Sequence, residues 1–312
     1  MAACKCSSAH WLQLLNAMQR TSIRSAFASL TYCRSGTNDA MMARPDRPRR
    51  SHRGLCPVQL RAIPAFADNY IWMLSDDLGN ALVVDPGVAE PVEAALQAHD
   101  LRLRTILITH HHADHIGGLQ ALAARHRSAV YMADDARIGG DGQRVHHGET
   151  LTLAAPALRA AVLALPGHTR SHVAYHLAPW LFCGDALFSL GCGRLFEGDP
   201  ADLLLSMQRI AALPPDTLVC AAHEYTLANA TFALSVEPDN DALRARRTLV
   251  QSLRARDLPS LPVALAEERA SNPFLRWDAP AVRAWCAAHG AATASPAACL
   301  GALRAGKDAF RA

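Results

Sequence analysis

The sequence contains nine cysteines but no C-x-x-C pair. Cysteines at that spacing commonly hold zinc or exchange disulfides, so no cysteine is expected in a metal site. Three of the cysteines, Cys183, Cys192 and Cys220, lie in or near apolar segments that read as strands. Reduced and mostly buried thiols fit this placement, and they are typical of a protein in the cytoplasm.

Long apolar runs and a serine-nucleophile motif are also missing. No uninterrupted apolar segment approaches the ~20 residues that a membrane-spanning helix needs, so we expect no membrane partner. The chain has no G-x-S-x-G, the turn that presents the nucleophile in α/β-hydrolases. Its composition is otherwise that of a globular protein, and 312 residues allow one large domain or two modest ones.

Acidic residues are absent from the first 38 positions. Residues 1–55 contain nine Lys or Arg against two Asp, a local net charge of +7, whereas the whole chain has a formal net charge of +3. Residues 56–312 therefore carry a net charge of −4. Nucleic-acid binding depends on a basic surface, so this acidic body predicts no nucleic-acid partner.

The N-terminal extension, residues 1–56, does not resemble part of a folded domain. One helical face of it would carry Trp11, Leu14, Leu15 and Met18. A mitochondrial presequence has this pattern and would place the protein in that organelle. The chain is also rich in Arg and Ala, as in genomes where an upstream start is easily assigned in error, and the natural start is then Met41 or Met42. We favour this second interpretation and expect a disordered extension on a cytoplasmic protein.

Residues 109–118, THHHADHIGG, are the most informative stretch of the chain. They follow a β-branched apolar run, residues 105–108, and precede the helix-forming segment 119–124. This order predicts a buried strand, a loop and then a helix. A histidine-rich surface loop is the alternative, but such loops rarely combine H-x-H-x-D-H spacing with a preceding buried strand and a following Gly-Gly.

The side chains of this loop have the chemistry of metal ligands. Alternate residues at the end of a strand share a face, so His110 and His112 should point together while His111 points away. Asp114 and His115 follow where the chain turns into the helix. Imidazole and carboxylate groups must converge at about 2 Å around a divalent ion. The loop supplies two such groups from the strand end and two from the helix start, so it predicts two adjacent metals rather than one.

Three later predicted strands each end in a further potential ligand, namely His168, Asp185 and His223. With the four from the first loop they make seven, which suits two metals that share a carboxylate. His172 lies close to His168 in the sequence, and it is a candidate to orient a ligand rather than to bind metal. Asp85 also ends a predicted strand, where we expect it to hydrogen-bond the backbone of the metal loop.

Residues 58–227 alternate predicted strands with helices, and some of the strands form hairpins, which together predict a layered α/β fold. After about Ala228 the strand signals stop. Three predicted helices follow at residues 241–256, 279–289 and 297–310. We therefore expect a layered domain that contains the candidate ligands over residues 57–227 and a smaller helical domain over residues 228–312.

The stretch THHHADHIGG resembles the signature of the metallo-β-lactamase superfamily, and further motifs resemble those of one of its families, the hydroxyacylglutathione hydrolases or glyoxalase II. The resemblance extends from about Val58 to the C-terminus. It implies a four-layer αβ/βα sandwich, with the site at one edge between two sheets, and a smaller C-terminal helical domain. The first metal is then held by His110, His112 and His168. The second is held by Asp114, His115 and His223, and Asp185 bridges the two.

Three segments resemble those with which the family binds glutathione. In LGCGRLFEG, Arg194 stands where some relatives have Lys, and Phe196 stands where some have Tyr, so that a hydroxyl contact is lost. Tyr225 belongs to an H-E-Y-T segment in which the tyrosine contacts the tripeptide. Arg304 and Lys307 match an R-x-x-K-D segment that binds the glycine carboxylate.

The activity implied by the resemblance is hydrolysis of an S-(2-hydroxyacyl)glutathione, chiefly S-D-lactoylglutathione, to D-lactate and glutathione, with Asp114 and Asp185 as catalytic residues. Two divalent metals about 3.5–4 Å apart lower the pKa of water and polarise a carbonyl, which suits this chemistry. A thiolate leaves without prior protonation because thiols have a pKa of about 8.5. Zinc is the expected metal, although iron and manganese accept the same ligands.

We expect a monomer whose partner is the small-molecule thioester. Two other interpretations stay open at this point. Another member of the superfamily, such as a persulfide dioxygenase with one iron, a β-lactamase or a lactonase, would share the metal loop but does not predict the glutathione segments together. A non-enzymatic metal scaffold conflicts with the complete ligand set and the acidic body.

Overall fold

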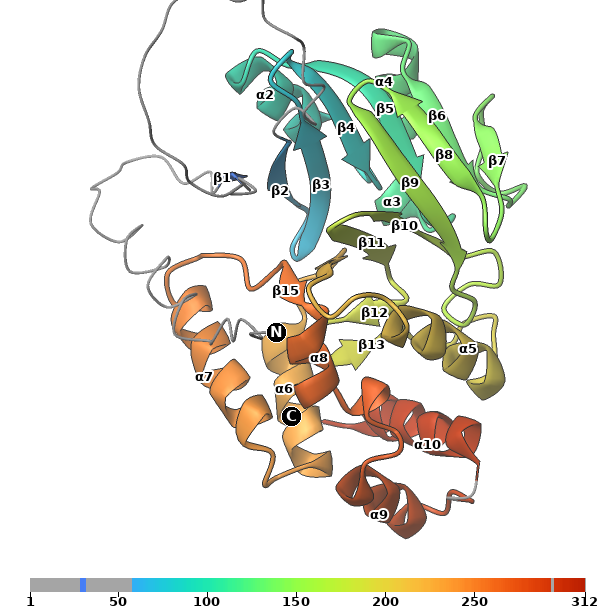
Figure 1. The fold of residues 1–312 in the computed structure, drawn as a ribbon, viewed down its shortest axis with the longest axis vertical. Helices are drawn as coiled ribbons and strands as arrows, with labels where there is room; N and C mark the ends of the chain where they lie inside the picture. Colours follow the sequence, from blue (N-terminus) through green and yellow to red (C-terminus); the bar gives the residue numbers. More distant parts are fainter. Residues whose placement is uncertain (1–28, 32–57, 293–294, 312) are drawn as a thin grey trace, which may run out of the picture.

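The computed structural model describes residues 29–31, 58–292 and 295–311 (Figure 1). The apolar helical face and both alternative start positions of the N-terminal extension lie outside the described residues. Of that extension the structure describes β1, which pairs with β2 at the edge of a sheet. This seven-stranded sheet runs in the order β1 (Ser29–Thr31), β2 (Gln59–Ala65), β3 (Asn69–Ser75), β4 (Asn80–Val84), β5 (Arg102–Ile108), β6 (Ala129–Ala133) and β7 (Gln143–Val145).

A second sheet of six strands faces the first one. Its order is β15 (Val263–Ala264), β14 (Leu218–Ala221), β11 (Trp180–Gly184), β10 (Val173–Leu177), β9 (Ala157–Ala164) and β8 (Thr150–Ala154). Strands β8 to β11 form antiparallel pairs, whereas β11 and β14 are parallel. A short hairpin of β12 (Leu187–Phe188) and β13 (Gly191–Cys192) leads away from this sheet.

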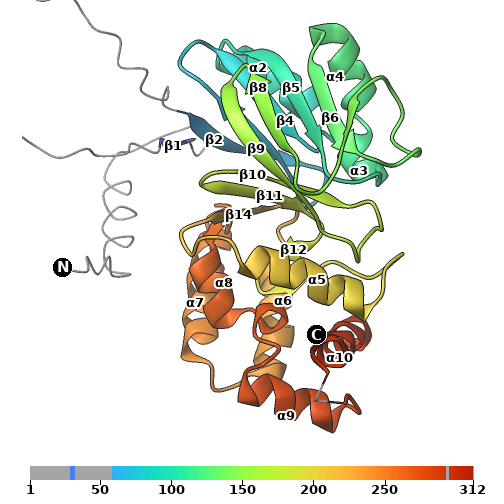
Figure 2. The same ribbon diagram turned by 45° about the vertical axis from the view of Figure 1, so that its right-hand side comes forward.

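Helices cover the outer faces of both sheets, which gives four layers. The helices are α2 (Glu90–Ala98), α3 (Ala113–Ile116), α4 (Leu119–His126), α5 (Pro200–Ala211), α6 (Thr226–Val236), α7 (Asp241–Arg254), α8 (Leu265–Ser271), α9 (Pro280–Ala288) and α10 (Pro296–Ala309). Figure 2 shows α2 and α4 outside the first sheet, and α5 with the later helices beyond the second. This arrangement confirms the predicted fold class.

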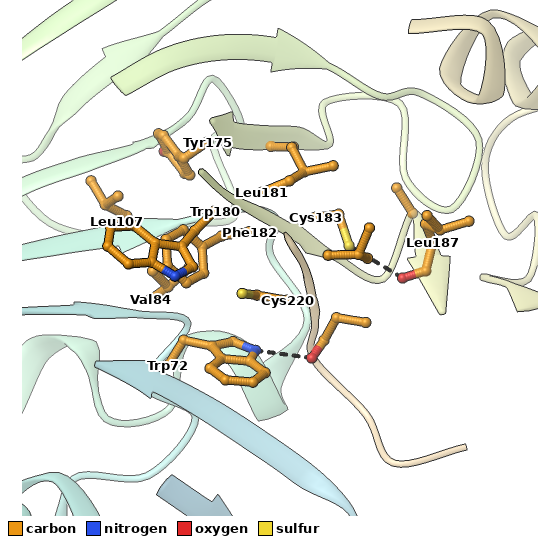
Figure 3. Close-up of a cluster of buried hydrophobic side chains, with 14 of the residues drawn as sticks. Trp72, Val84, Leu107, Tyr175, Trp180, Leu181, Phe182, Cys183, Leu187 and Cys220 are labelled. Atoms are coloured by element: carbon orange, nitrogen blue, oxygen red, sulfur yellow. Dashed lines mark hydrogen bonds between the residues drawn. The ribbon is translucent and has the colours of Figure 1, made fainter. Parts of the chain in front are cut away.

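The main core lies between the two sheets, where large apolar side chains from both are fully buried (Figure 3). Every residue of β3 and of β11 is buried, which explains why these strands read as continuous apolar runs. Two polar groups in this core bond across the interface: Trp72 Nε1 donates to the Ala221 carbonyl at 2.9 Å, and Tyr175 Oη donates to the Ile108 carbonyl at 2.9 Å. These bonds fix the register of one sheet on the other.

The region after Ala228 is largely helical, but the prediction that strands stop there was wrong. The two residues of β15, Val263 and Ala264, pair with β14 and complete the second sheet. So short a strand shows no periodicity that a sequence can reveal. Helix α6 was also not predicted, because its apolar residues are spread around the helix rather than along one stripe. Among the described helices, none is both long and apolar enough to cross a membrane.

The two sheets meet at one edge through backbone hydrogen bonds. Tyr70 N, at the start of β3, donates to the Ala222 carbonyl after β14 at 2.7 Å. Val173 N, at the start of β10, donates to the Thr109 carbonyl after β5 at 3.0 Å. The carboxyl ends of β5, β11 and β14 are thereby brought to the same edge. Six of the seven candidate ligands follow those ends, and His168 follows β9.

Candidate metal centre

The metal loop is placed by the end of β5, but the strand stops earlier than expected. Pairing with β6 ends at Ile108, so His110, His111 and His112 belong to a loop, and α3 begins after His112. The prediction that His110 and His112 point together is correct, but the reason given for it, the alternation of side chains along a strand, is wrong. His110 Nε2 still lies 3.1 Å from His112 Nδ1, whereas His111 Nδ1 lies 3.4 Å from Asp135 Oδ2, on the far side of the loop.

Asp85 supports the backbone of this loop through hydrogen bonds, as expected. Its Oδ1 accepts from Thr109 N at 2.7 Å, and its Oδ2 accepts from Thr109 Oγ1 at 2.7 Å. The same Oδ2 lies 3.1 Å from His115 Nδ1. Asp85 is buried, so one carboxylate joins the end of β5 to the first turn of α3 and turns the other ring nitrogen of His115 toward the cluster.

A first group of potential ligand atoms converges above the end of β5. It consists of His110, His112, His168 and Asp185. His168 follows β9, and its Nε2 lies 2.9 Å from His112 Nδ1 and 3.4 Å from Asp185 Oδ2. The four residues come from three separate strand ends, as the sequence predicted, and three imidazoles with one carboxylate suit a zinc-type ion.

A second group lies next to the first and consists of Asp114, His115 and His223. His115 Nε2 and His223 Nε2 each lie 3.4 Å from Asp114 Oδ2. Both nitrogens also lie 3.4 Å from Asp185 Oδ1. The two oxygens of Asp185 therefore face different groups, which is the geometry that a shared carboxylate requires. All seven predicted ligands are brought together.

Two buried polar atoms that lack hydrogen bonds to other described residues indicate that this cluster fits metal ions. His115 Nε2 and Asp185 Oδ1 are inaccessible to solvent, and neither has a hydrogen-bond partner among the described residues. A buried polar atom without a hydrogen bond destabilises the folded state, so a pair of such atoms that face each other calls for an explanation. A cation bound between them would satisfy both. The donor set of imidazole and carboxylate accepts zinc, iron or manganese.

Outer hydrogen bonds orient the ligand rings. Asp68 Oδ1 lies 2.7 Å from His223 Nδ1, and the Arg194 carbonyl lies 3.0 Å from His168 Nδ1, so in each ring Nε2 is left toward the cluster. Asn69 Nδ2 donates to Asp114 Oδ2 at 3.0 Å. The roles of Asp68 and Asn69 were not predicted from the sequence, although both lie at the beginning of a predicted strand segment, residues 67–74, in a D-N-Y sequence that resembles the family.

His172 occupies the place expected of an orienting residue. It is fully buried, its ring stacks on that of His110 at 4.8 Å, and its Nε2 accepts from Asp185 N at 3.2 Å. Burial, reinforced by the neighbouring His168, holds the pKa of His172 well below its ordinary value. It therefore stays neutral beside the ligands and supports the backbone of Asp185.

The electrostatics of the cluster favour a cation. Burial tends to raise the pKa of Asp185, but His115 and His223 outweigh burial and hold the pKa below its ordinary value. Burial holds the pKa of His110 well below its ordinary value, and the charge of the adjacent His115 acts in the same direction. Burial also acts to lower the pKa of His223, but hydrogen bonds to Asp114 and Asp185 raise the pKa to about 10. The ionised carboxylates of Asp114 and Asp185 thus favour a positive charge beside them, either a proton on His223 or a metal ion. A metal ion that binds there releases the proton from the imidazole.

Three of the predicted substrate-binding residues lie around the cluster. The Tyr225 ring stacks on His223 with centroids 4.7 Å apart. Phe196 is 62% exposed, and its ring centroid lies 5.7 Å from that of His112 and 5.3 Å from that of His168. Arg194 is exposed next to this face. These side chains form an aromatic and cationic border to the open side of the two groups.

The last two predicted substrate-binding residues lie on α10. Arg304 is only 6% exposed; its Nη1 donates to the Cys192 carbonyl at 2.7 Å and its Nη2 donates to Asp308 at 3.0 Å. Asp308 also lies 3.3 Å from Arg194 Nε. Lys307 is half-buried, and its Nζ donates to the Ala228 carbonyl at 3.1 Å. Helix α10 therefore reaches the hairpin before Arg194, but most of the Arg304 guanidinium is committed to protein groups.

Two family profiles together match residues 67–310 of the chain. The profile of a family described as "Metallo-beta-lactamase superfamily" matches residues 67–223, and one described as "Hydroxyacylglutathione hydrolase C-terminus" matches residues 224–310. A curated protein of Cupriavidus taiwanensis, named hydroxyacylglutathione hydrolase, is 51% identical over 267 residues, and the match covers 81% of this chain and 100% of the relative. One of Xanthomonas campestris pv. campestris with the same name is 50% identical over 258 residues, 82% of this chain and 100% of the relative.

A solved structure supports the fold alone. The crystal structure of the B3 metallo-β-lactamase BLEG-1 superposes with a TM-score of 0.52 at 24% sequence identity. The superposition covers 70% of this chain and 99% of that one.

Proposed function

Because the chain belongs to the hydroxyacylglutathione hydrolase family of the metallo-β-lactamase superfamily, we propose that it hydrolyses S-(2-hydroxyacyl)glutathione, chiefly S-D-lactoylglutathione, to D-lactate and glutathione. The observation that carries the proposal is the position of Asp185, whose two oxygens face two separate groups of ligand atoms. The curated relatives named hydroxyacylglutathione hydrolase, each matched over its full length, support the substrate class.

We propose that the cluster holds two divalent ions, with zinc as the expected metal and iron or manganese as alternatives. The first group of ligands would be His110, His112 and His168. The second would be Asp114, His115 and His223, with Asp185 shared between them. When bound, two such ions lower the pKa of water and polarise a carbonyl group.

The residues of the chain then have distinct tasks. Asp114 and Asp185 stay ionised and supply the negative charge that collects the ions. Asp68 and Asp85 fix the rings of His223 and His115, so that the ligand nitrogens do not have to reorganise during the reaction. No acidic group has to protonate the leaving sulfur, because a thiolate whose thiol has a pKa of about 8.5 is a good leaving group without prior protonation.

The border residues would bind the tripeptide. The Tyr225 and Phe196 rings stand on either side of the ligand cluster, next to His223 and His168. The Lys307 ammonium is half-buried and is available for the glycine carboxylate, with Arg304 and Arg194 contributing positive charge nearby. These contacts would place the catalytic role and the aromatic contacts to glutathione in residues 57–227, and the contact with the glycine carboxylate in the helical domain, residues 228–312. The proposed protein acts as a monomer.

The location proposed for this enzyme is the cytoplasm. The five described cysteines are free and buried, which fits a reducing compartment.

The decisive test combines metal analysis with two assays on the same preparation. We expect about two metal ions per chain and rapid hydrolysis of S-D-lactoylglutathione. A persulfide dioxygenase would instead contain one iron and consume oxygen with glutathione persulfide. A lactonase would hydrolyse a lactone faster than the thioester. Either result would overturn the proposed activity while leaving the family unchanged.

A further inference from the structure

Beside the ligand cluster, four charged or ionisable side chains join loops that are far apart in the sequence. They are His111, Asp135, Arg137 and Glu197, and we refer to them as the loop clasp. None of the four belongs to the seven proposed ligands. The sequence analysis assigned no role to Asp135, Arg137 or Glu197.

Asp135 is the buried end of the clasp and follows β6. It accepts from Arg137 Nε at 2.8 Å and from Arg137 Nη2 at 2.7 Å, which is a bidentate pair. It also accepts from Ser171 Oγ at 2.6 Å, and His111 Nδ1 lies 3.4 Å away. The hydrogen bonds from Arg137 are the main reason that the pKa of Asp135 lies below its ordinary value. One carboxylate thus joins three loops.

Glu197 is the outer end of the clasp. Its Oε1 accepts from Arg137 Nη1 at 2.5 Å, and its Oε2 accepts from Arg170 N at 2.8 Å. His111 Nε2 lies 3.8 Å from the same Oε1. Arg137 therefore stands between two carboxylates, and its planar guanidinium sets the separation between the loop that contains Asp135 and the segment that contains Glu197.

The residues next to the clasp belong to the proposed site. Glu197 follows Phe196 directly, and the Phe196 ring lies against His112 and His168. The clasp also holds Ser171, three residues after His168, on the same loop. A shift at Glu197 would therefore move the adjacent Phe196 ring directly, whereas the contact of this segment with a ligand is made three residues earlier, by the Arg194 carbonyl.

We propose that Arg137 is a positioning residue that holds the segment 193–198 over the first ligand group through Glu197. The inference rests on the proposed function, since it concerns the binding of the same glutathione thioester. The pair between Arg137 and Glu197 joins side chains that are 52% and 21% exposed, and an ion pair at the surface contributes little to stability by itself. Its effect should therefore fall on substrate binding, through the geometry of one loop, rather than on folding.

A double-mutant cycle tests this pairing. Arg137→Ala and Glu197→Gln should each raise KM for S-D-lactoylglutathione by about three- to tenfold, with a smaller change in kcat. The double variant should be no worse than either single variant, because both remove the same contact. Arg137→Lys should recover only part of the loss, since an ammonium cannot bond both carboxylates as a planar fork does. Metal content should not change, and Glu197→Gln, which keeps the pair of Arg137 with the buried Asp135, should retain the thermal midpoint of the wild type.

A matched control comes from a distant ion pair of the same chemistry. Arg244 Nη2 lies 2.7 Å from Asp241 on the exposed face of α7, and Arg244→Ala should leave KM and kcat unchanged. Binding of a non-hydrolysable S-alkylglutathione, measured by calorimetry, gives a readout that does not depend on turnover. Its Kd should rise in Arg137→Ala and Glu197→Gln by the same factor as KM.

The outcomes separate the two proposals. If the wild-type protein fails to hydrolyse the thioester, the proposed function fails whatever the variants do. If the wild-type protein is active but the two single effects add in the double variant, or KM and Kd stay unchanged in Arg137→Ala, the positioning role is overturned. A fall in metal content or thermal midpoint that accounts for the loss would also overturn it, because the clasp would then support the fold.

Discussion

Asp185 Oδ1 lies 3.4 Å from His115 Nε2 in a buried position, and neither atom has a hydrogen-bond partner within the described part of the chain. Each residue is held by its neighbours, His115 through Asp85 and Asp185 through His172. The pair is therefore positioned in advance and left unsatisfied at its centre. Two buried atoms without hydrogen bonds do not stabilise the folded chain by themselves, whereas a cation bound between them would give both atoms a partner.

The first prediction concerns the shared carboxylate. Asp185→Asn should remove most of both metals and nearly all hydrolysis, because an uncharged amide cannot serve two cations. Metal content per chain, measured by mass spectrometry alongside turnover, checks this. Asp239→Asn, on a fully exposed carboxylate, is the control and should behave as the wild type. Two metals per chain with near-normal turnover in Asp185→Asn would rule out the shared role.

The second prediction concerns the outer support of the second ligand group. Asp68→Ala removes the carboxylate that lies 2.7 Å from His223 Nδ1. Loss of such a partner typically weakens metal affinity by about 10–100-fold, so one metal should be released to a chelator far more readily than the other. Asp77→Ala, on an exposed turn, provides the comparison. Equal retention of both metals would mean that Asp68 does not orient His223.

The third prediction separates Lys307 from Arg304. Lys307→Ala should raise KM for the glutathione thioester by about tenfold, since a charge-assisted bond of about 1.5 kcal/mol is lost while metal content stays constant. Arg304→Ala should instead lower the free energy of unfolding by about 1.5–3 kcal/mol, because it breaks a buried bond to the Cys192 carbonyl and a partly exposed bond to Asp308. Steady-state kinetics and urea unfolding distinguish the two effects. Similar behaviour of both variants would contradict this division.

The fourth prediction is a pH dependence in the helical region. Burial raises the pKa of Glu268 above its ordinary value, although hydrogen bonds from Ser189 and the Leu190 amide oppose the shift. The folded state therefore binds the proton more tightly than the unfolded state does. The contribution of this group to stability is present below the unfolded pKa of about 4.3 and is lost as the pH rises through the folded pKa.

Glu268→Gln should remove this dependence, because an amide does not titrate. Relative to the wild type, the variant should gain stability between pH 4 and pH 8, by about 1.4 kcal/mol for each unit by which the folded and unfolded pKa values differ. Urea midpoints at both pH values measure the gain. The exposed neighbour Glu267 offers a matched control, and Glu267→Gln should follow the wild type. Parallel curves for all three proteins would show that Glu268 is not the titrating group.

Much of the candidate site was predictable because local patterns encode where strands end. The apolar runs before His110, Asp185 and His223 became β5, β11 and β14, and each ligand follows its strand in the structure. The role of Asp85 was predictable for the same reason, since a carboxylate after a buried strand needs a backbone donor. The resemblance to a known family then ordered these residues into two metal-binding groups.

The remaining features depended on contacts between distant parts of the chain. The burial of Arg304 follows from the packing of α10 against the hairpin that contains Cys192, which no local pattern reveals. The strand β15 exists because β14 offers it a partner, and two residues alone have no preference for that conformation. The loop clasp likewise required β6, β9 and the segment after β13 to meet.

The sequence by itself determined which side chains can bind metal and which strands deliver them, because hydrophobic periodicity and ligand chemistry are properties of short segments. Only the tertiary structure decided which oxygen of Asp185 faces which group, and that Asp135 is the residue that His111 meets on the side away from the ligand cluster. Those choices depend on how one sheet packs on the other, through bonds such as Tyr70 N to the Ala222 carbonyl. Distances of a few ångströms between residues many positions apart are set by that packing and by nothing local.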